Sequence, residues 1–294
     1  MLNLLRAEWL KAIWNYRLTG FLVWILPVGI GAFYVVMLVS SLASTRFAEG
    51  MLATGAGSWT DDALGVWNLV VTFPFNVIGR MLPLAFMAVV FASEYQSGMW
   101  KNLVPRASRP ALILSKLAVL TALIMLAFVF TSIVTVIGQG LGHRLVGTDY
   151  GPTLTGAVAQ EFIAHYAQSA VLALASLLIL AGGAALAAIL TRSVLGGLLI
   201  GFGLSVFDSM SLVFLLLLSR MLDQPDLINL YRFTPSYNLD NALTWFRNGV
   251  GYILPVGDFS TPPSLLFSLA VLLIWIAGFN GLSVWLFQRQ DLTA

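Results

Sequence analysis

The feature that most constrains this chain is a series of six long apolar stretches separated by more polar segments. A helix needs about 20 mostly apolar residues to cross about 30 Å of hydrocarbon, and each stretch is long enough. Backbone groups in lipid must satisfy their own hydrogen bonds, so continuous apolar runs predict helices rather than barrel strands. The sequence therefore predicts an all-α integral membrane protein with six transmembrane helices, at about Leu18–Val39, Phe73–Ala92, Leu117–Gly138, Ser169–Leu190, Val194–Leu218 and Ser264–Phe287.

The composition excludes several other classes of protein. Only 10% of the 294 residues are charged and 59% are hydrophobic, which argues against a disordered chain or a soluble globule with a charged surface. The chain has no cysteine, so it carries no disulfide framework and no thiolate metal site. A net charge of +2 is too small to indicate a nucleic-acid partner.

Basic residues predict the orientation. If the N-terminus is cytoplasmic, the inner segments hold nine Lys or Arg and three acidic residues, while the outer segments hold five basic and nine acidic residues. This is the asymmetry that the positive-inside rule expects. We therefore expect both termini to be cytoplasmic. The fourth and fifth spans are separated only by Thr191, Arg192 and Ser193, which predicts a tight helical hairpin at the inner face.

Two segments outside the spans have helical patterns. Residues 1–17 place Leu5, Trp9 and Ile13 on one apolar stripe with Glu8 and Lys11 on the polar side, which predicts an amphipathic helix lying in the inner interface. The outer segment 219–263, between the fifth and sixth spans, is predicted to contain one or two short helices. No linker divides the chain, so we expect residues 1–294 to form a single transmembrane domain.

The inner loop over residues 93–116 is the most charged segment of the chain. Gly98 allows a turn, and Pro110 favours a helix start. The pattern predicts a short cytoplasmic helix between the second and third spans.

This loop resembles a known motif. It matches the E-Y-x-x-G-x-x-K-N-x-L … S-R … S-K pattern of ABC-2 type transporter permeases, in the small six-span branch that includes bacitracin-resistance and lantibiotic-immunity permeases. The Met99-Trp100 pair departs from the more usual Thr plus an apolar residue. The matching residues are Glu94-Tyr95, Gly98, Lys101-Asn102-Leu103, Ser108-Arg109 and Ser115-Lys116.

The resemblance implies a permease subunit of an ATP-driven exporter in a bacterial plasma membrane. The short inner helix would be a coupling helix that docks on a separate P-loop ATPase, present in two copies, and a second permease subunit, identical or different, would complete the transporter. The permease itself would be non-catalytic and bind no cofactor, with ATP and Mg on the ATPase; the chain has no phosphate-binding loop of its own. Membrane lipid and a peptide antibiotic, drug or lipid substrate would be the other partners.

The residues that this resemblance assigns to coupling with the ATPase are Glu8, Glu94, Tyr95, Gly98, Lys101, Arg106, Arg109 and Lys116. Anchoring at the inner face is the simpler explanation of the basic ones.

Two charged residues lie within the predicted spans. Arg80 and Asp208 each fall about 20–24 Å from the inner boundary, so they share a depth in the outer leaflet. They either pair across neighbouring spans, or jointly line a polar outer cavity, or each reaches the outer interface independently. In the fifth span Gly197 and Gly201 form a G-x-x-x-G pattern, which predicts a contact between permease subunits.

An alternative from another class is an ion-coupled secondary transporter or channel that uses Arg80 and Asp208. It would predict broken helices or charges at the midplane, and these two residues lie above it. His143 and His165 lack metal-ligand spacing, so we expect no metal site, and no motif for an intramembrane enzyme is present.

Overall fold

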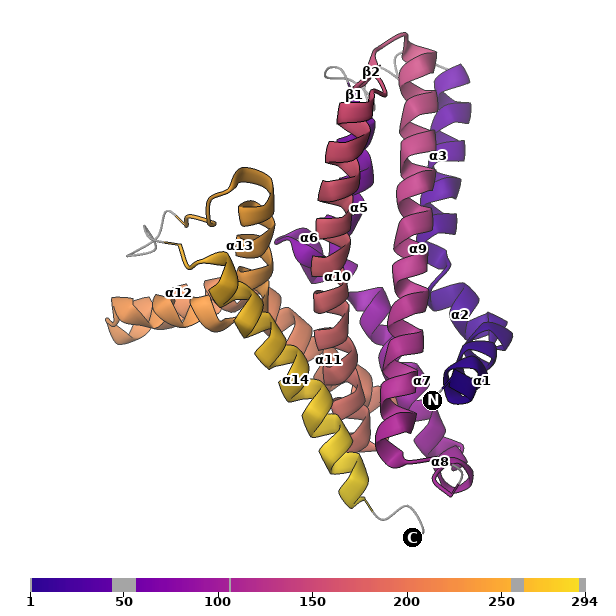
Figure 1. The fold of residues 1–294 in the computed structure, drawn as a ribbon, viewed down its shortest axis with the longest axis vertical. Helices are drawn as coiled ribbons and strands as arrows, with labels where there is room; N and C mark the ends of the chain where they lie inside the picture. The colour runs from indigo at the N-terminus through magenta and orange to yellow at the C-terminus, as the bar shows by residue number, and fades with distance from the viewer. Residues whose placement is uncertain (1, 44–56, 106, 255–261, 291–294) are drawn as a thin grey trace.

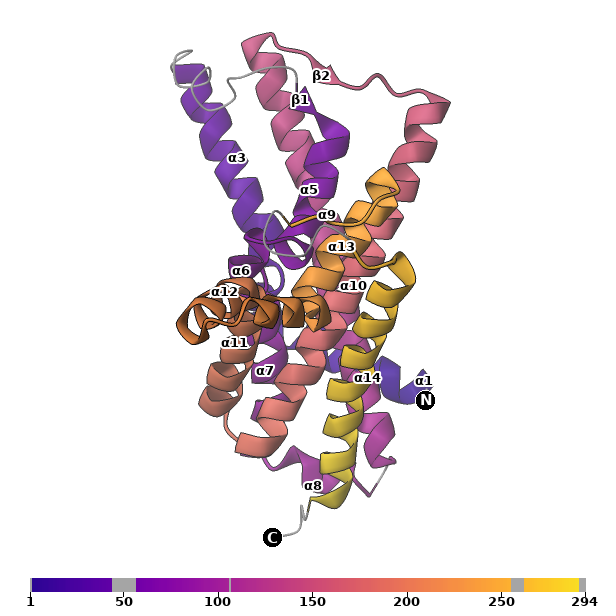
Figure 2. The ribbon, with the colours of Figure 1, turned by 90° about the vertical axis from the view of Figure 1, so that its left-hand side faces the viewer.

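Two long helices, α9 (Arg109–Val146) and α10 (Gly156–Thr191), form the frame of the protein (Figure 1). The structure is a computed structural model that describes residues 2–43, 57–105, 107–254 and 262–290. The 38 and 36 residues of the two helices correspond to lengths of about 57 and 54 Å. Both helices exceed the thickness of a bilayer core, and their outer ends spread apart (Figure 2). The spans predicted at Leu117–Gly138 and Ser169–Leu190 are therefore correctly located but too short.

The outer extension is held together by an element that the hydropathy pattern did not predict. Helix α5 (Trp59–Val71) packs against both α9 and α10. Its Trp67 is fully buried, with ring centroids 5.6 Å from Phe128 and 5.5 Å from Tyr166. Above it, β1 (Gly57–Ser58) pairs in parallel with β2 (Tyr150–Gly151). Packing against α5 lets α9 and α10 continue as helices beyond the lipid.

The remaining spans assemble around α10. Helices α7 (Met81–Gln96), α11 (Val194–Ser209) and α14 (Leu265–Arg289) all pack on it, while α3 (Ile25–Ala43) packs on α9. In the most apolar part of α10, 83% of the residues are buried, against 17% in α14. Helix α10 is therefore central, and α14 lies at the periphery with few buried residues.

The predicted hairpin between the fourth and fifth spans is present. Helix α10 ends at Thr191, Arg192 adopts a left-handed conformation with φ 51°, and the Ser193 hydroxyl caps α11 by accepting from the Gly196 amide.

The prediction of one continuous fifth span over Val194–Leu218 is wrong. The chain bends by 69° between α11 and α12 (Ser211–Leu222), and α12 lies nearly perpendicular to α9 and α10 (Figure 1). The bend follows Asp208, whose backbone carbonyl accepts a hydrogen bond of 2.6 Å from the Ser211 hydroxyl. The segment is apolar apart from Asp208 and a few serines, so its mean hydropathy gave no sign of the bend.

The second span is also interrupted. A short helix, α6 (Phe75–Gly79), precedes α7, and the two meet at Arg80. Beyond α12, the outer segment forms a 3-10 helix, η1 (Pro225–Phe233), and α13 (Pro235–Asn248), in agreement with the predicted short helices. Helix α13 packs on α10 and α14 and lies at the outer end of α14, while α10 extends beyond it (Figure 1).

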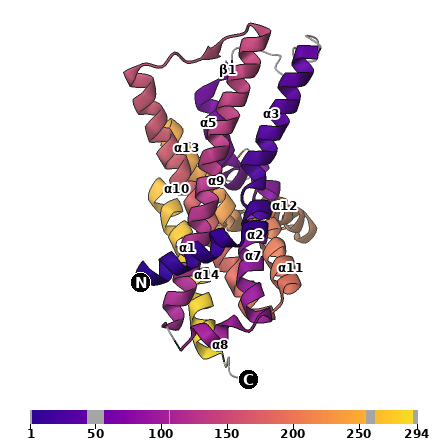
Figure 3. The same ribbon diagram turned by 90° about the vertical axis from the view of Figure 1, so that its right-hand side faces the viewer.

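At the N-terminus, the amphipathic segment is divided. Helix α1 (Leu2–Trp14) crosses α9 near its inner end, and α2 (Tyr16–Leu22) continues toward the first span (Figure 3). The first span proper begins at Ile25, later than predicted. Trp14 is exposed, whereas Glu8, expected on the polar side, is buried against the protein.

Within the described residues, five helices are long and apolar enough to cross a membrane, and the bent α11–α12 pair is the sixth candidate. The fold class is therefore confirmed as an all-α integral membrane protein.

The junction of α5 and α6 provides a test of this packing. A side chain on Gly79 would collide with the backbone carbonyl of Leu69, whereas one on Gly65 of α5 would meet no atom within 4 Å. We expect Gly79→Ala to destabilise the protein by about 1–3 kcal/mol, because forcing atoms into a packed site displaces backbone. Thermal unfolding in detergent measures this, with Gly65→Ala as the matched control. Equal melting temperatures for the two variants would contradict the arrangement.

Candidate functional site

The inner end of the protein carries a five-residue helix, α8 (Met99–Leu103), at the position predicted for the coupling helix. Gly98 precedes it with φ 65°, a left-handed conformation that glycine adopts without strain. Helix α9 then begins at Arg109 with Pro110 in its first turn. Figure 1 shows α8 at the same end of the molecule as the last turn of α14. The described part of the loop therefore contains a short helix at the inner end of the spans.

Trp100 anchors α8 to the rest of the protein. It is 2% exposed, and its ring centroid lies 4.6 Å from that of Phe287 on α14 and 5.7 Å from that of Tyr95 on α7. In the resemblance to the family motif, Met99-Trp100 is only a departure from the usual pattern. A tryptophan in the most charged loop of the chain was the available signal for this anchor.

Four charged side chains meet directly beside this helix. We call Glu8 and Lys11 of α1, Glu94 of α7 and Lys116 of α9 the inner charge cluster. The Lys116 Nζ atom lies 2.9 Å from Glu8 Oε2 and 2.6 Å from Glu94 Oε1, and Lys11 Nζ contacts the same Glu94 oxygen. The cluster therefore joins three elements that are far apart in the sequence.

The centre of the cluster is removed from solvent, whereas the Lys11 side chain at its edge is 37% exposed. Lys116 is 1% and Glu94 2% exposed. The Lys116 ammonium also lies 5.7 Å from the centroid of the Trp100 ring and 5.9 Å from that of Phe91, within the range of a cation–π contact. A buried charge is tolerated only with partners, so the two carboxylates and the lysine hold one another in place. A lysine that only anchors the protein at the inner face would not need to be buried with two carboxylate partners, so anchoring alone does not explain Lys116.

The other predicted coupling residues have different surroundings. Tyr95 donates from its hydroxyl to Gln290 Oε1 at 2.9 Å. Arg109 Nη1 donates to the backbone carbonyls of Phe287, Gln288 and Gln290 at 2.7–2.9 Å, which satisfies carbonyls that the end of α14 leaves open. Lys101 is exposed on α8. Arg106 lies outside the described residues.

A second group of charges lies at the outer end of α7. We call Arg80, Asp208, Ser236 and Asp240 the outer cluster. Arg80 Nη1 lies 2.7 Å from Asp208 Oδ2, and its Nε donates to the Val70 carbonyl at 3.0 Å. Ser236 of α13 donates to Asp208 from both its amide, at 3.1 Å, and its hydroxyl, at 2.7 Å. Arg80 and Asp208 therefore pair across α7 and α11 instead of reaching the interface separately.

Asp240 adds a second carboxyl to this cluster. The pKa of the Asp240 carboxyl is raised to about 7. Burial is the main cause and the charge of Asp208 adds to it, while a backbone hydrogen bond at Phe73 and the Arg80 charge act in the opposite direction. Asp240 lines a polar cavity between α5 and α13, together with Asn68, Thr72, Thr244 and Arg247. The sequence gives no sign of a role for Asp240, because it is one of several acidic residues in the outer segment 219–263 and its burial depends on tertiary packing.

The two glycines assigned to a subunit contact are buried within this chain. A side chain on Gly197 would touch Ala188 of α10, and one on Gly201 would press on Leu84 of α7. They allow α11 to pack closely inside the subunit, which accounts for the small residues without a second copy. Their role in a dimer contact stays a prediction.

Removing the central cation tests the inner charge cluster. Lys116→Met keeps a long side chain but leaves Glu8 and Glu94 buried with too little positive charge, so we expect a loss of about 3–5 kcal/mol in stability. Thermal unfolding in detergent measures the loss. Lys101→Met removes an exposed charge from the same loop and should leave the melting temperature unchanged; a similar loss in both variants would show that burial of Lys116 is not the cause.

The pKa of Asp240 predicts a pH dependence of stability. An ordinary Asp ionises with a pKa of 3.8, so between this pH and about 7 the folded protein retains a proton that the unfolded chain has lost. Raising the pH through this window therefore destabilises the wild-type protein. Asp240→Asn has no proton to lose, and we expect its melting temperature, relative to wild type, to rise between about pH 4 and pH 7 and then level off. A constant difference in melting temperature between Asp240→Asn and wild type across this pH range would contradict the prediction.

A family comparison accounts for much of the chain. The model of a family described as ABC-2 family transporter protein matches residues 5–208, from α1 through Asp208. The match includes α8 and the inner charge cluster, and it ends before α12, α13 and α14. No curated protein matches the chain. With more than half of its length matched, the chain belongs to the ABC-2 transporter family.

Proposed function

We propose that this protein is the permease subunit of an exporter driven by a separate P-loop ATPase, which docks on α8. The observation that carries the proposal is the anchoring of α8. A helix of five residues at the inner end is packed through Trp100 on α7 and α14 and lies beside the inner charge cluster, which joins α1, α7 and α9. A force applied to α8 would therefore act on four elements together.

The surface of α8 supports this assignment. Trp100 faces the protein, while Lys101 on the next position is exposed. An exposed cation next to a rigid anchor can contribute electrostatic complementarity to a partner surface. In this proposal ATP and Mg bind to the ATPase, in two copies, and the permease supplies no catalytic residue.

The proposal places the protein in a bacterial plasma membrane with both termini and α8 in the cytoplasm. A second permease subunit, identical or different, completes the transporter. Hydrophobic or amphipathic molecules, such as a peptide antibiotic, a drug or a lipid, are the expected substrates. The positive-inside asymmetry supports this orientation, and the lipid-facing surface of α14 is consistent with a role among membrane-soluble molecules.

Affinity purification tests the coupling surface. We expect the tagged full-length protein, co-expressed with its genomic neighbours, to co-purify with a P-loop ATPase in mild detergent. Lys101→Glu should lower the ATPase yield by about tenfold, since reversing a charge at an interface rim costs on the order of 1–2 kcal/mol. The readouts are mass spectrometry and ATP hydrolysis.

Arg144→Glu is the matched control. Arg144 is an exposed cation near the outer end of α9, so the same charge change there should leave the ATPase yield unchanged. Purification of the wild-type protein alone, without ATP hydrolysis, would overturn the proposal. Equal ATPase yields for the two variants would show that Lys101 is not part of the docking surface.

A further inference from the structure

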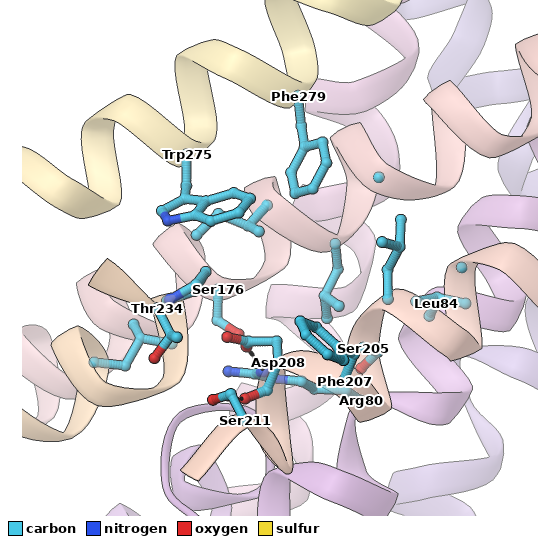
Figure 4. A pocket seen from close by; sticks show the side chains of 17 residues that line it. Arg80, Leu84, Ser176, Ser205, Phe207, Asp208, Ser211, Thr234, Trp275 and Phe279 are labelled. Atoms are coloured by element: carbon cyan, nitrogen blue, oxygen red, sulfur yellow. Dashed lines mark hydrogen bonds and ion pairs between the residues drawn. The ribbon is translucent and has the colours of Figure 1, made fainter. Parts of the chain in front are cut away.

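Asp240 is a buried acidic residue that the proposed function does not use. It is 7% exposed and lies on α13 one helical turn after Ser236, so the two side chains are on the same side of the helix. Ser236 donates to Asp208 from both its amide and its hydroxyl. These bonds bring Asp240 close to the pair of Arg80 and Asp208, which Figure 4 shows side by side.

The charges of this group do not balance when Asp240 is ionised. Arg80 already neutralises Asp208, with 2.7 Å between Nη1 and Oδ2. Within the described residues, no cation forms an ion pair with Asp240. A second buried carboxylate beside a single arginine leaves an uncompensated negative charge, and the nearby carboxylate adds repulsion. The Asp240 carboxyl therefore retains a proton more readily than an exposed aspartate does.

A polar cavity connects this carboxyl with solvent. The cavity lies between α5 and α13 and has a volume of about 210 Å³, enough for several water molecules. Along α13 its lining begins at Asp240 and ends at Arg247 and Asn248, which are exposed at the end of the helix. Asn68 and Thr72 of α5 add further polar groups. Water held by these walls can carry protons between Asp240 and the outer surface.

No other group in these surroundings is expected to titrate between the ordinary pKa of aspartate and neutral pH. Burial raises the pKa of both tyrosines near Asp240, and arginine stays protonated throughout this range. Asp61 of α5 faces Arg247, and neither α10 nor α14 adds a charged side chain to the described lining. The charged and titratable groups around Asp240 are Arg80 where α6 meets α7, Asp208 of α11, Arg247 of α13, Tyr231 of η1, and Tyr252.

We propose that Asp240 is a proton-binding site open to the extracytoplasmic side through this cavity, and that release of its proton loosens α13 from α7 and α11. In this step the carboxylic acid becomes a carboxylate and its proton passes to water in the cavity. The carboxylate repels Asp208, to which Ser236 binds α13, and competes with it for Arg80. Without a cation of its own it is stabilised by water, which favours an arrangement with α13 farther from α7 and α11. The switch involves no ATPase, so it does not depend on the proposed function.

Infrared difference spectroscopy of the full-length protein in lipid nanodiscs detects the proton directly. Between about pH 5 and pH 9 the carbonyl stretch of a protonated carboxylic acid should disappear. We expect a midpoint near pH 7 and no such band in Asp240→Asn. Asp226 is an exposed acid of the outer segment, so Asp226→Asn is the matched control and should keep the band. A wild-type protein without a titrating band, or a band that persists in Asp240→Asn, would overturn the assignment.

Spin labels measure the movement of α13. The chain has no cysteine, so Ile78→Cys on α6 and Val250→Cys just beyond α13, at sites that are 75% and 54% exposed, give a single labelled pair. We expect a longer or broader distance distribution at about pH 9 than at about pH 5 in the wild-type background, and no change in Asp240→Asn. A pair at Leu145 of α9 and Ile163 of α10 is the control and should not respond to pH.

A distance that is independent of pH in the wild-type background would overturn the switch, and so would an equal response in Asp240→Asn. The wild-type measurements decide this even if Asp240→Asn fails to fold, which melting curves show.

An impermeant thiol reagent added to intact cells tests the side to which the cavity opens. Thr244→Cys, at a position that lines the cavity, should react, whereas Lys101→Cys on α8 should react only after the cells are opened. Reaction of Thr244→Cys only in opened cells would overturn access from the outer side. If no ATPase co-purifies but these three results are obtained, the proposed function fails and this inference stands.

Discussion

The inner half of this protein depends on one buried cation. Lys116 has almost no contact with solvent, and it is stable there because Glu8 and Glu94 accept from its ammonium group. Three segments from different parts of the chain must come together to satisfy it. The position of α1 across α9, and of α7 beside both, therefore follows from a charge requirement as well as from apolar packing.

A second charge requirement shapes the outer half. Asp208 interrupts an otherwise apolar run, and it is satisfied by Arg80 and by two donors of Ser236. This pairing holds α13 over the ends of α7 and α11, next to the 69° bend that sends α12 sideways. An apolar groove is left between α11 and α14, because both helices pack on α10 and not extensively on one another.

Helix α7 connects the two clusters. Arg80 lies at its outer end and Glu94 near its inner end, 14 residues apart or about 21 Å along a helix. Gly201 lets α11 approach α7 near Leu84, and Trp100 ties α8 to Tyr95 at the other end. A single packed element thus links the proposed docking helix with the outer cluster.

The amino-acid sequence by itself determined the membrane class, the order of the spans, the hairpin at Arg192 and the short helix after Gly98, because long apolar runs, turns and charge asymmetry are local properties. It also identified Glu94, Lys116 and Glu8 as candidate coupling residues, without indicating that their side chains contact one another. Only the tertiary structure decided the bend after Asp208, the outer helix α5, the anchor at Trp100 and the pairing of buried charges. These depend on partners distant in sequence, since hydropathy records how apolar a segment is but not which neighbour satisfies its polar groups.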